Sequence, residues 1–465
     1  MRRRPASSPP AHPVDEVPPI GRLAAYGLQH VLAMYAGAVA VPLIVGGAMK
    51  LPSGDLAYLI NADLLVSGVA TLIQCVGVWK FGVRLPLMQG CTFAAVTPMV
   101  LIGTTGGGLP AIYGAVIVSG LVMTLLAPYF ARLLRFFPPL VTGLVILIIG
   151  LTLLPNAADW AAGGAGAADY GAPRNLALAL GVLVFILLVH RFAGGFLGRV
   201  SVLLGIVVGT LVAIPLGFTD FGHVGEAAVL GVSTPFHFGL PTFKVAAIVS
   251  LMIVMLVSAA ETTGDILATG EAVDVEVSPD RLARGLRADG ASTVLGGVFN
   301  TFPYTAFAQN IGLIGLTKVK SRWVVAAAGV ILIVLGLFPK LGEVIAAVPP
   351  PVLGGAGIAM FGTVAASGVR TLRTVAFDGN ANLLIIAVTV GVALAPVARP
   401  DLYAHFPEGF QIVMNSGISA GAIVAIVLNL LFNHLGAGRR GSTADAAGDA
   451  ATTEHSGGVT AEDPA

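Results

Sequence analysis

The sequence predicts an all-α membrane protein with fourteen transmembrane segments, arranged as two inverted seven-segment repeats with one broken segment in each. Three observations predict this fold. Hydrophobic residues make up 56% of the 465 residues, charged residues only 11%, and the mean hydropathy is +0.90, whereas soluble domains carry roughly 25% charged residues. Apolar runs of near-spanning length recur along the chain, and two similar Pro- and Gly-rich segments lie in its two halves.

A membrane helix needs roughly 20 residues. Eleven apolar runs reach that length alone or with their flanking residues: Leu23–Met49, Leu56–Val78, Leu109–Tyr129, Leu140–Leu154, Leu176–Val189, Val202–Phe218, Val245–Ala268, Val324–Phe338, Val352–Ala366, Leu383–Ala398 and Ile412–Leu435. Gln89–Gly103 and Tyr304–Leu316 are interrupted by Gly, Pro and polar residues, so we expect each to be a short extended stretch followed by a half-helix. These two segments and Ala288–Phe302 bring the total to fourteen.

The cationic residues support this count. With the N-terminus in the cytoplasm, all but five of the 25 Lys and Arg fall on the cytoplasmic side, as the positive-inside rule requires. The five outer ones are Lys50, Arg174, Lys244, Lys340 and Arg399. We therefore expect a multi-pass protein of the cytoplasmic (inner) membrane with both termini inside. Residues 1–20 and 436–465 are polar and are predicted to be disordered tails around a transporter-like unit at 21–435.

Composition also excludes several classes of function. The net charge is +1, and no basic cluster with interleaved aromatics indicates a nucleic-acid partner. Cys75 and Cys91 lie in apolar segments, so neither a disulfide nor a metal site is predicted, and no cofactor is expected. Gly417–Gly421 matches a nucleophile-elbow pattern but lies in an apolar span, where small residues pack helices. No nucleophile and base are grouped, so an enzyme is not predicted.

The two halves of the chain resemble each other. Phe137–Gly143 matches Pro349–Gly355, and the interrupted segments lie at nearly the same offset. The first repeat covers about 21–218 and the second about 240–435. Because each holds seven crossings, the second is inverted relative to the first. Broken segments at matching places in inverted repeats indicate a binding site at the membrane midplane.

Polar residues in the apolar spans are the candidates for that site, because burying them in lipid is costly. Glu261 and Asp265 are four residues apart and share one helix face, so they cannot both ionise readily and one should hold a proton. Gln309 and Asn310 offer paired donors and acceptors in the second interrupted segment. A carboxylate opposite an amide can bind a flat heterocycle, and Phe93 can stack on it.

The stretch from Gln309 to Lys318 resembles the signature of the nucleobase–ascorbate transporter family (nucleobase:cation symporter 2), and Glu261–Asp265 resembles the carboxylate segment of its eighth span. The resemblance covers about residues 21–435 and is strongest to bacterial xanthine and uric acid permeases. It implies a core of spans 1–4 and 8–11, a gate of spans 5–7 and 12–14, and proton-coupled, elevator-like uptake of a purine, usually by a homodimer.

The resemblance also implies roles for individual residues. Glu261 and Gln309 would hydrogen-bond the base, Phe93 would stack on it, and the backbone at Ala308 and Phe93 would complete the site. Thr92 favours uric acid. Three further polar residues, Asn310, Asp289 and His30, would support the site.

Several alternatives remain open at this point. Asp265 can be a solvated residue at the helix end, Asp289 an ion-pair partner at the membrane edge, and His30 a structural, neutral residue. Uracil or another nucleobase is an alternative substrate. An anion carrier on the same fold would need a cation near the half-helix, where this chain has Gln309 and Glu261. A channel would need a ring of charge.

Overall fold

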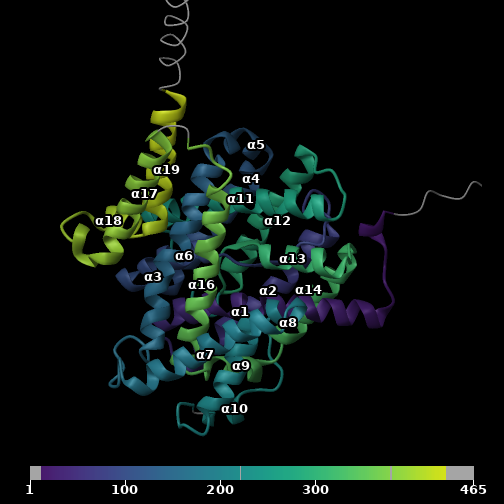
Figure 1. The fold of residues 1–465 in the computed structure, drawn as a ribbon, viewed down its shortest axis with the longest axis vertical. Helices are drawn as coiled ribbons and strands as arrows, with labels where there is room; N and C mark the ends of the chain where they lie inside the picture. Colours follow the sequence, from purple (N-terminus) through teal and green to yellow (C-terminus); the bar gives the residue numbers. More distant parts are fainter. Residues whose placement is uncertain (1–11, 220, 378–379, 436–465) are drawn as a thin grey trace, which may run out of the picture.

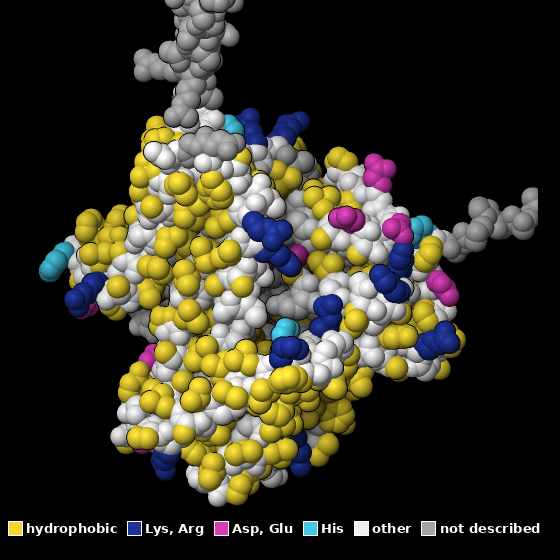
Figure 2. Space-filling view, in the orientation of Figure 1, with side chains coloured by type: hydrophobic (Ala, Val, Ile, Leu, Met, Phe, Trp, Pro, Cys, Tyr) yellow, Lys and Arg dark blue, Asp and Glu magenta, His cyan; other side chains and the backbone are white. Residues whose placement is uncertain are grey.

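The structure is a computed structural model, and it describes residues 12–219, 221–377 and 380–435. Within these residues, nine helices are long and apolar enough to cross a membrane, or ten if a pair bent by 81° counts as one span. Figure 1 shows α17, α18 and α19 on one side of the molecule and α12, α13 and α14 on the other. Hydrophobic side chains cover most of the face in Figure 2, as expected of a polytopic α-helical membrane protein.

The first half of the chain contains one short strand among its helices. Its elements are α1 (Ile20–Ala48), α2 (Ser53–Val76), β1 (Gln89–Cys91), α3 (Val96–Ile102), α4 (Gly108–Leu126), α5 (Phe130–Leu133), α6 (Pro139–Ala161), α7 (Pro173–Phe192), α8 (Gly195–Arg199), α9 (Ser201–Ala213) and α10 (Gly222–Glu226).

The second half repeats this pattern of one short strand followed by a helix. Its elements are α11 (Val245–Ala272), α12 (Pro279–Val298), β2 (Tyr304–Ala306), α13 (Ala308–Thr317), α14 (Arg322–Gly336), α15 (Pro339–Ala346), α16 (Pro350–Leu372), α17 (Asn380–Ala398), α18 (Glu408–Met414) and α19 (Gly417–Asn429). The bent pair is α14 and α15.

Both interrupted segments are a strand followed by a short helix, which confirms that prediction. β1 and β2 pair antiparallel, with Gly90 opposite Thr305, and all six strand residues are buried. Burial within protein is the condition under which extended backbone is tolerated at membrane depth. Gly90 is required here because a Cβ at this position would lie 2.3 Å from the Phe307 ring. We call β1, the turn that follows it and α3 together the first broken segment, and β2 with α13 the second. The helical parts of the two segments are the half-helices.

The two helices that begin with the repeated Pro-rich motif pack against each other. α6 and α16 each have a proline at their first position, which suits the start of a helix. Their backbones approach closely at glycine: a Cβ on Gly150 would lie 2.4 Å from the Ala365 nitrogen, and one on Gly354 would lie 2.1 Å from the Ala161 nitrogen. Small residues permit such contacts between helices in lipid.

One predicted boundary differs in the structure. The crossing expected at Ala288–Phe302 is α12, which begins at Pro279 and ends at Val298. The Ser278 side chain caps its start by accepting a hydrogen bond from the Arg281 N–H at 3.3 Å, and a capped start with proline next favours a helix. Arg281, Arg284 and Arg287, which precede the expected crossing in the sequence, therefore lie within the helix.

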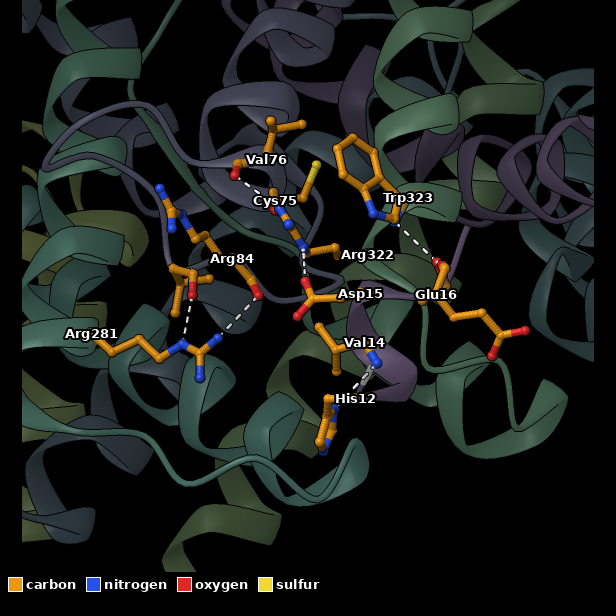
Figure 3. Close-up of polar contacts among 12 residues, drawn as sticks. His12, Val14, Asp15, Glu16, Cys75, Val76, Arg84, Arg281, Arg322 and Trp323 are labelled. Atoms are coloured by element: carbon orange, nitrogen blue, oxygen red, sulfur yellow. Dashed lines mark hydrogen bonds and ion pairs between the residues drawn. The ribbon is translucent and has the colours of Figure 1, made fainter. Parts of the chain in front are cut away.

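Of the predicted N-terminal tail, residues 12–19 are described and contact the rest of the chain, while residues 1–11 and the predicted C-terminal tail at 436–465 lie outside the described residues. Val14 is 2% exposed. Asp15 Oδ1 accepts a hydrogen bond from Arg322 Nε at 2.7 Å, and Arg322 Nη1 also donates to the Cys75 and Val76 carbonyls at 3.1 and 2.9 Å (Figure 3). This segment therefore joins the N-terminus to α14 and to the end of α2.

A second ion pair lies near this segment, outside the spans. Lys320, between α13 and α14, pairs with Asp274, in the loop between α11 and α12. The hydrogen bond from the ammonium group, together with its charge, lowers the pKa of Asp274 from its ordinary value. Because both groups are accessible to solvent, we expect this pair to contribute little to stability.

Candidate functional site

The long helix α11 is hydrogen-bonded to both broken segments. Ser258 Oγ lies 3.2 Å from Thr92 Oγ1. One turn later, Thr262 Oγ1 lies 3.0 Å from Thr305 Oγ1 and accepts a hydrogen bond from the Ala306 N–H at 3.3 Å. α11 also contacts α3 and α13. The part of α11 that carries Ser258 and Thr262 is therefore fixed against the paired strands β1 and β2. We call the place where these strands pair the strand crossing.

The predicted carboxylates lie on this same part of α11. Glu261 is half-buried, and within the described residues its carboxylate has no hydrogen-bond or ion-pair partner. Asp265 follows one turn later, and its Oδ2 is buried without a partner in the described chain. The buried Oδ2 contradicts the alternative of a fully solvated Asp265.

The two signature amides of α13 have different surroundings. Ala308 and Gln309 begin the helix and are exposed, and Gln309 bonds to no other described residue. Asn310 is 1% exposed, and its Nδ2 donates to the His30 carbonyl oxygen at 2.9 Å and to His30 Nδ1 at 3.1 Å. Because Nδ1 accepts, the imidazole proton is on Nε2 and the ring is neutral. Asn310 thus joins α13 to α1, while Gln309 stays available to a ligand.

Phe93 begins the turn that follows β1, at the start of the first half-helix. Its ring meets Phe361 of α16 edge-on, with centroids 5.9 Å apart and planes at 78°. Thr92 caps this turn, because its Oγ1 accepts a hydrogen bond from the Ala94 N–H at 3.2 Å. With its second contact to Ser258, the Thr92 hydroxyl positions the start of the half-helix.

Asp289 is 2% exposed, and the hydrogen-bond partners that it has among the described side chains are amides and not arginines. Its Oδ1 accepts hydrogen bonds from Gln89 Nε2 at 2.9 Å and Gln74 Nε2 at 3.1 Å. The Gln74 Oε1 in turn accepts from the Val83 N–H at 3.1 Å. Asp289 therefore joins α12 to β1 and α2, a support role that two glutamines make possible.

A second buried carboxylate supports the strands, and the sequence analysis missed it. Asp63 Oδ1 accepts hydrogen bonds from Cys91 Sγ at 2.7 Å, Tyr304 Oη at 2.8 Å and Thr301 Oγ1 at 3.1 Å. Asp63 lies in the apolar run Leu56–Val78, so the signal that marked Glu261, an acid within a span, also marked this residue. We call Asp63, Cys91, Thr301 and Tyr304 the Asp63 cluster.

These hydrogen bonds join the elements that carry the predicted residues, namely α1, α11, α12 and the two broken segments. Asp265 lies one turn beyond Glu261 along α11. A cavity of about 650 Å³ opens elsewhere, between α7 and α9. Its lining is almost entirely apolar and includes none of the predicted residues. A polar ligand would therefore find more hydrogen-bonding groups at the strand crossing than in this cavity. Within the described residues, no three His, Cys, Asp or Glu side chains are grouped as metal ligands.

Comparison with known proteins extends over most of the chain. A family model described as "Permease family" matches residues 21–402. The nucleobase transporter PlUacP of Paenibacillus larvae is 48% identical over 87% of this chain and 93% of its own. The xanthine permease of Bacillus subtilis is 46% identical over 89% and 94%, and the uric acid transporter UacT of Escherichia coli is 45% identical over 92% and 90%.

Two solved structures share the fold. The transmembrane domain of the cyanobacterial bicarbonate transporter BicA matches with a TM-score of 0.53 and 15% identity, over 88% of this chain and 98% of that one. The murine anion transporter Slc26a9 matches with a TM-score of 0.59 and 12% identity, over 89% and 68%. At such low identity these similarities establish the architecture alone.

Proposed function

This chain belongs to the xanthine/uracil permease family of membrane transporters, within the nucleobase–ascorbate transporters, and on that premise we propose that it takes up a purine nucleobase, xanthine or uric acid, together with protons. The identity of 45–46% to a xanthine permease and a uric acid transporter, over about nine-tenths of each chain, carries the proposal. A permease changes the location of its substrate and not its covalent bonds, so the protein is not an enzyme.

The purine is proposed to lie between α11 and the starts of the two half-helices. Glu261 has no partner in the described chain and accepts hydrogen bonds from ring N–H groups. The exposed Gln309 supplies one donor and one acceptor, and the backbone N–H groups at Ala308 and Phe93 add the positive end of each half-helix. Phe93 stacks on the ring, and Thr92 lines the site through its backbone, since its hydroxyl is already bonded.

Fourteen spans in two inverted repeats are proposed to form two bodies. The core comprises spans 1–4 and 8–11, which correspond to α1, α2, the first broken segment and α4, and to α11, α12, the second broken segment and α14. The gate comprises spans 5–7 and 12–14, namely α6, α7, α9, α16, α17 and α19. The core carries the site across the membrane in an elevator-like movement, in a homodimer of the cytoplasmic membrane with both termini inside. The shared architecture with BicA and Slc26a9 supports this division.

Proton coupling is proposed to involve Glu261 and Asp265 as a pair, supported by Asp289, Asn310 and His30. Two carboxylates one turn apart resist ionising together. When one carboxylate is protonated, the other can therefore stay charged and accept hydrogen bonds from the base. Because interacting groups titrate together, the proton belongs to the pair and not to one residue.

Uptake of radiolabelled xanthine by a transporter-deficient bacterium that expresses the chain tests the function. We expect saturable uptake that unlabelled uric acid or xanthine inhibits and uracil does not. Uptake should rise as the external pH falls and collapse with a protonophore. Absence of xanthine uptake together with saturable uptake of labelled uracil would point to a pyrimidine permease. Sodium-dependent uptake that resists the protonophore would overturn the coupling.

The second prediction concerns substrate selection by Gln309. A purine 2,6-dione alternates carbonyl and N–H groups along one edge, and an amide matches both. An ionised Glu has only acceptors and meets a carbonyl with no donor. Gln309→Glu should therefore weaken xanthine or uric acid inhibition by more than ~1 kcal/mol, the scale of one buried hydrogen bond. Inhibition by pyrimidines should improve relative to the parent.

Gln309→Glu is measured by inhibition constants for a series of bases, at matched amounts of protein in the membrane. Gln411→Glu provides the control, because among the described residues this amide bonds only to the carbonyls of Ala404 and Phe406, just before α18. If a well-expressed Gln309→Glu protein kept the parent's inhibitor profile, Gln309 would pack the half-helix and not read the base.

A further inference from the structure

The last residue of the short helix α8, Arg199, lies against α13. A Cβ placed on Gly312 would be 2.1 Å from Arg199 Nη1 and 3.1 Å from its Cζ. The guanidinium group therefore occupies the space that a side chain at position 312 would need. The two helices also lie next to each other.

Beyond its approach to Gly312, the Arg199 side chain makes no polar contact within the described chain. It is exposed, and in the described part of the chain its guanidinium has neither an ion pair nor a hydrogen bond. Gly312 lies three residues after Gln309, so the two positions share one face of α13. Arg199 therefore covers the half-helix about one turn beyond the amide proposed to read the base.

The contact joins the two bodies of the proposed transporter. α8 connects α7 to α9 in the gate, whereas α13 belongs to the core. We propose that Arg199 is a positioning residue for transport: it holds α13 against the gate in the conformation that the structure shows and must release it when the core moves. This inference rests on the proposed elevator mechanism, and it adds a residue that touches no substrate.

Glycine is required at position 312 for this contact and not for the backbone. Gly312 lies within α13 and has an ordinary negative φ. An alanine there would fit the helix and would displace only the flexible end of Arg199. Gly315 provides a matched control one turn later, because a Cβ on it would meet nothing within 4 Å.

The test compares Arg199→Ala, Gly312→Ala and the double variant with two controls. Gly315→Ala is the glycine control, and Arg191→Ala is the arginine control, since Arg191 stacks only on the neighbouring Phe192. Each single variant should change the maximal uptake rate about threefold or more with an unaltered dissociation constant for xanthine. The double variant should be no further from the parent than either single one, because both break one contact. Both controls should behave as the parent.

A readout without substrate separates this inference from the proposed function. Hydrogen exchange of the purified, ligand-free protein should be faster at the α13 amides in Arg199→Ala and Gly312→Ala, and unchanged in α3 and in the two controls. Unchanged exchange in α13, or effects of the two variants that multiply, would overturn the positioning role. A parent that exchanges as expected but transports no purine would refute the proposed function and leave the contact standing.

Discussion

We expect Glu261→Gln to remove high-affinity purine binding and to leave the protein folded in the membrane. The substitution preserves the shape of the side chain but replaces one acceptor oxygen by an N–H₂ donor. That donor would face the N–H groups of the base, and each mismatched buried pair costs about 1–3 kcal/mol. One such mismatch would weaken binding by roughly tenfold or more. The fold should tolerate the change because Glu261 has no partner among the described residues.

Binding of labelled xanthine to the purified protein measures this effect, with thermal unfolding recorded on the same sample. Glu271→Gln is a matched control, because Glu271 is an exposed residue at the end of the same helix, α11. The control should bind as the parent does. A Glu261→Gln protein that bound xanthine as tightly as the parent would show that this carboxylate does not contact the base.

Local signals in the sequence predicted the architecture of the broken segments. Gly interrupts both Gln89–Gly103 and Tyr304–Leu316, with Pro98 inside the first and Pro303 just before the second, and the structure has a strand and a short helix in each. These breaks are visible because the surrounding apolar runs are otherwise continuous. The helical face shared by Glu261 and Asp265 followed from their spacing alone, since both lie on α11.

Contacts between distant parts of the chain could not be predicted in this way. The Asp63 cluster joins residues up to 241 positions apart, and no spacing rule pairs a carboxylate in one span with a tyrosine in a later strand. The contact of Arg199 with Gly312 depends equally on how α8 and α13 pack. Residues 12–19 have the composition of a disordered tail. Asp15 nevertheless accepts a hydrogen bond from Arg322, because the start of α14 lies beside it.

The Asp63 cluster gives the largest expected effect on stability. Asp63→Ala leaves Cys91 Sγ, Thr301 Oγ1 and Tyr304 Oη without their common acceptor, and all three side chains are fully buried. Tyr304 Oη keeps the Asp63 backbone carbonyl as an acceptor at 3.2 Å, so Cys91 and Thr301 lose most. At roughly 1–3 kcal/mol for each unsatisfied buried donor, the total is about 2 kcal/mol or more. Cys91 is on β1 and Tyr304 is on β2. Loss of Asp63 should therefore loosen the strand crossing that positions both half-helices.

Thermal unfolding in detergent and xanthine binding at low temperature together measure this prediction. Asp63→Ala should lower the unfolding temperature strongly and weaken binding as well, whereas Glu261→Gln should weaken binding alone. Tyr304→Phe removes a single donor and leaves the Asp63 Oδ1 bonded to Cys91 and Thr301, so its cost should be near ~1 kcal/mol. Because the two side chains share one network, the double variant should be less unstable than the sum of the single variants. An Asp63→Ala protein as stable as the parent would mean that the strand crossing is held by the backbone ladder and packing alone.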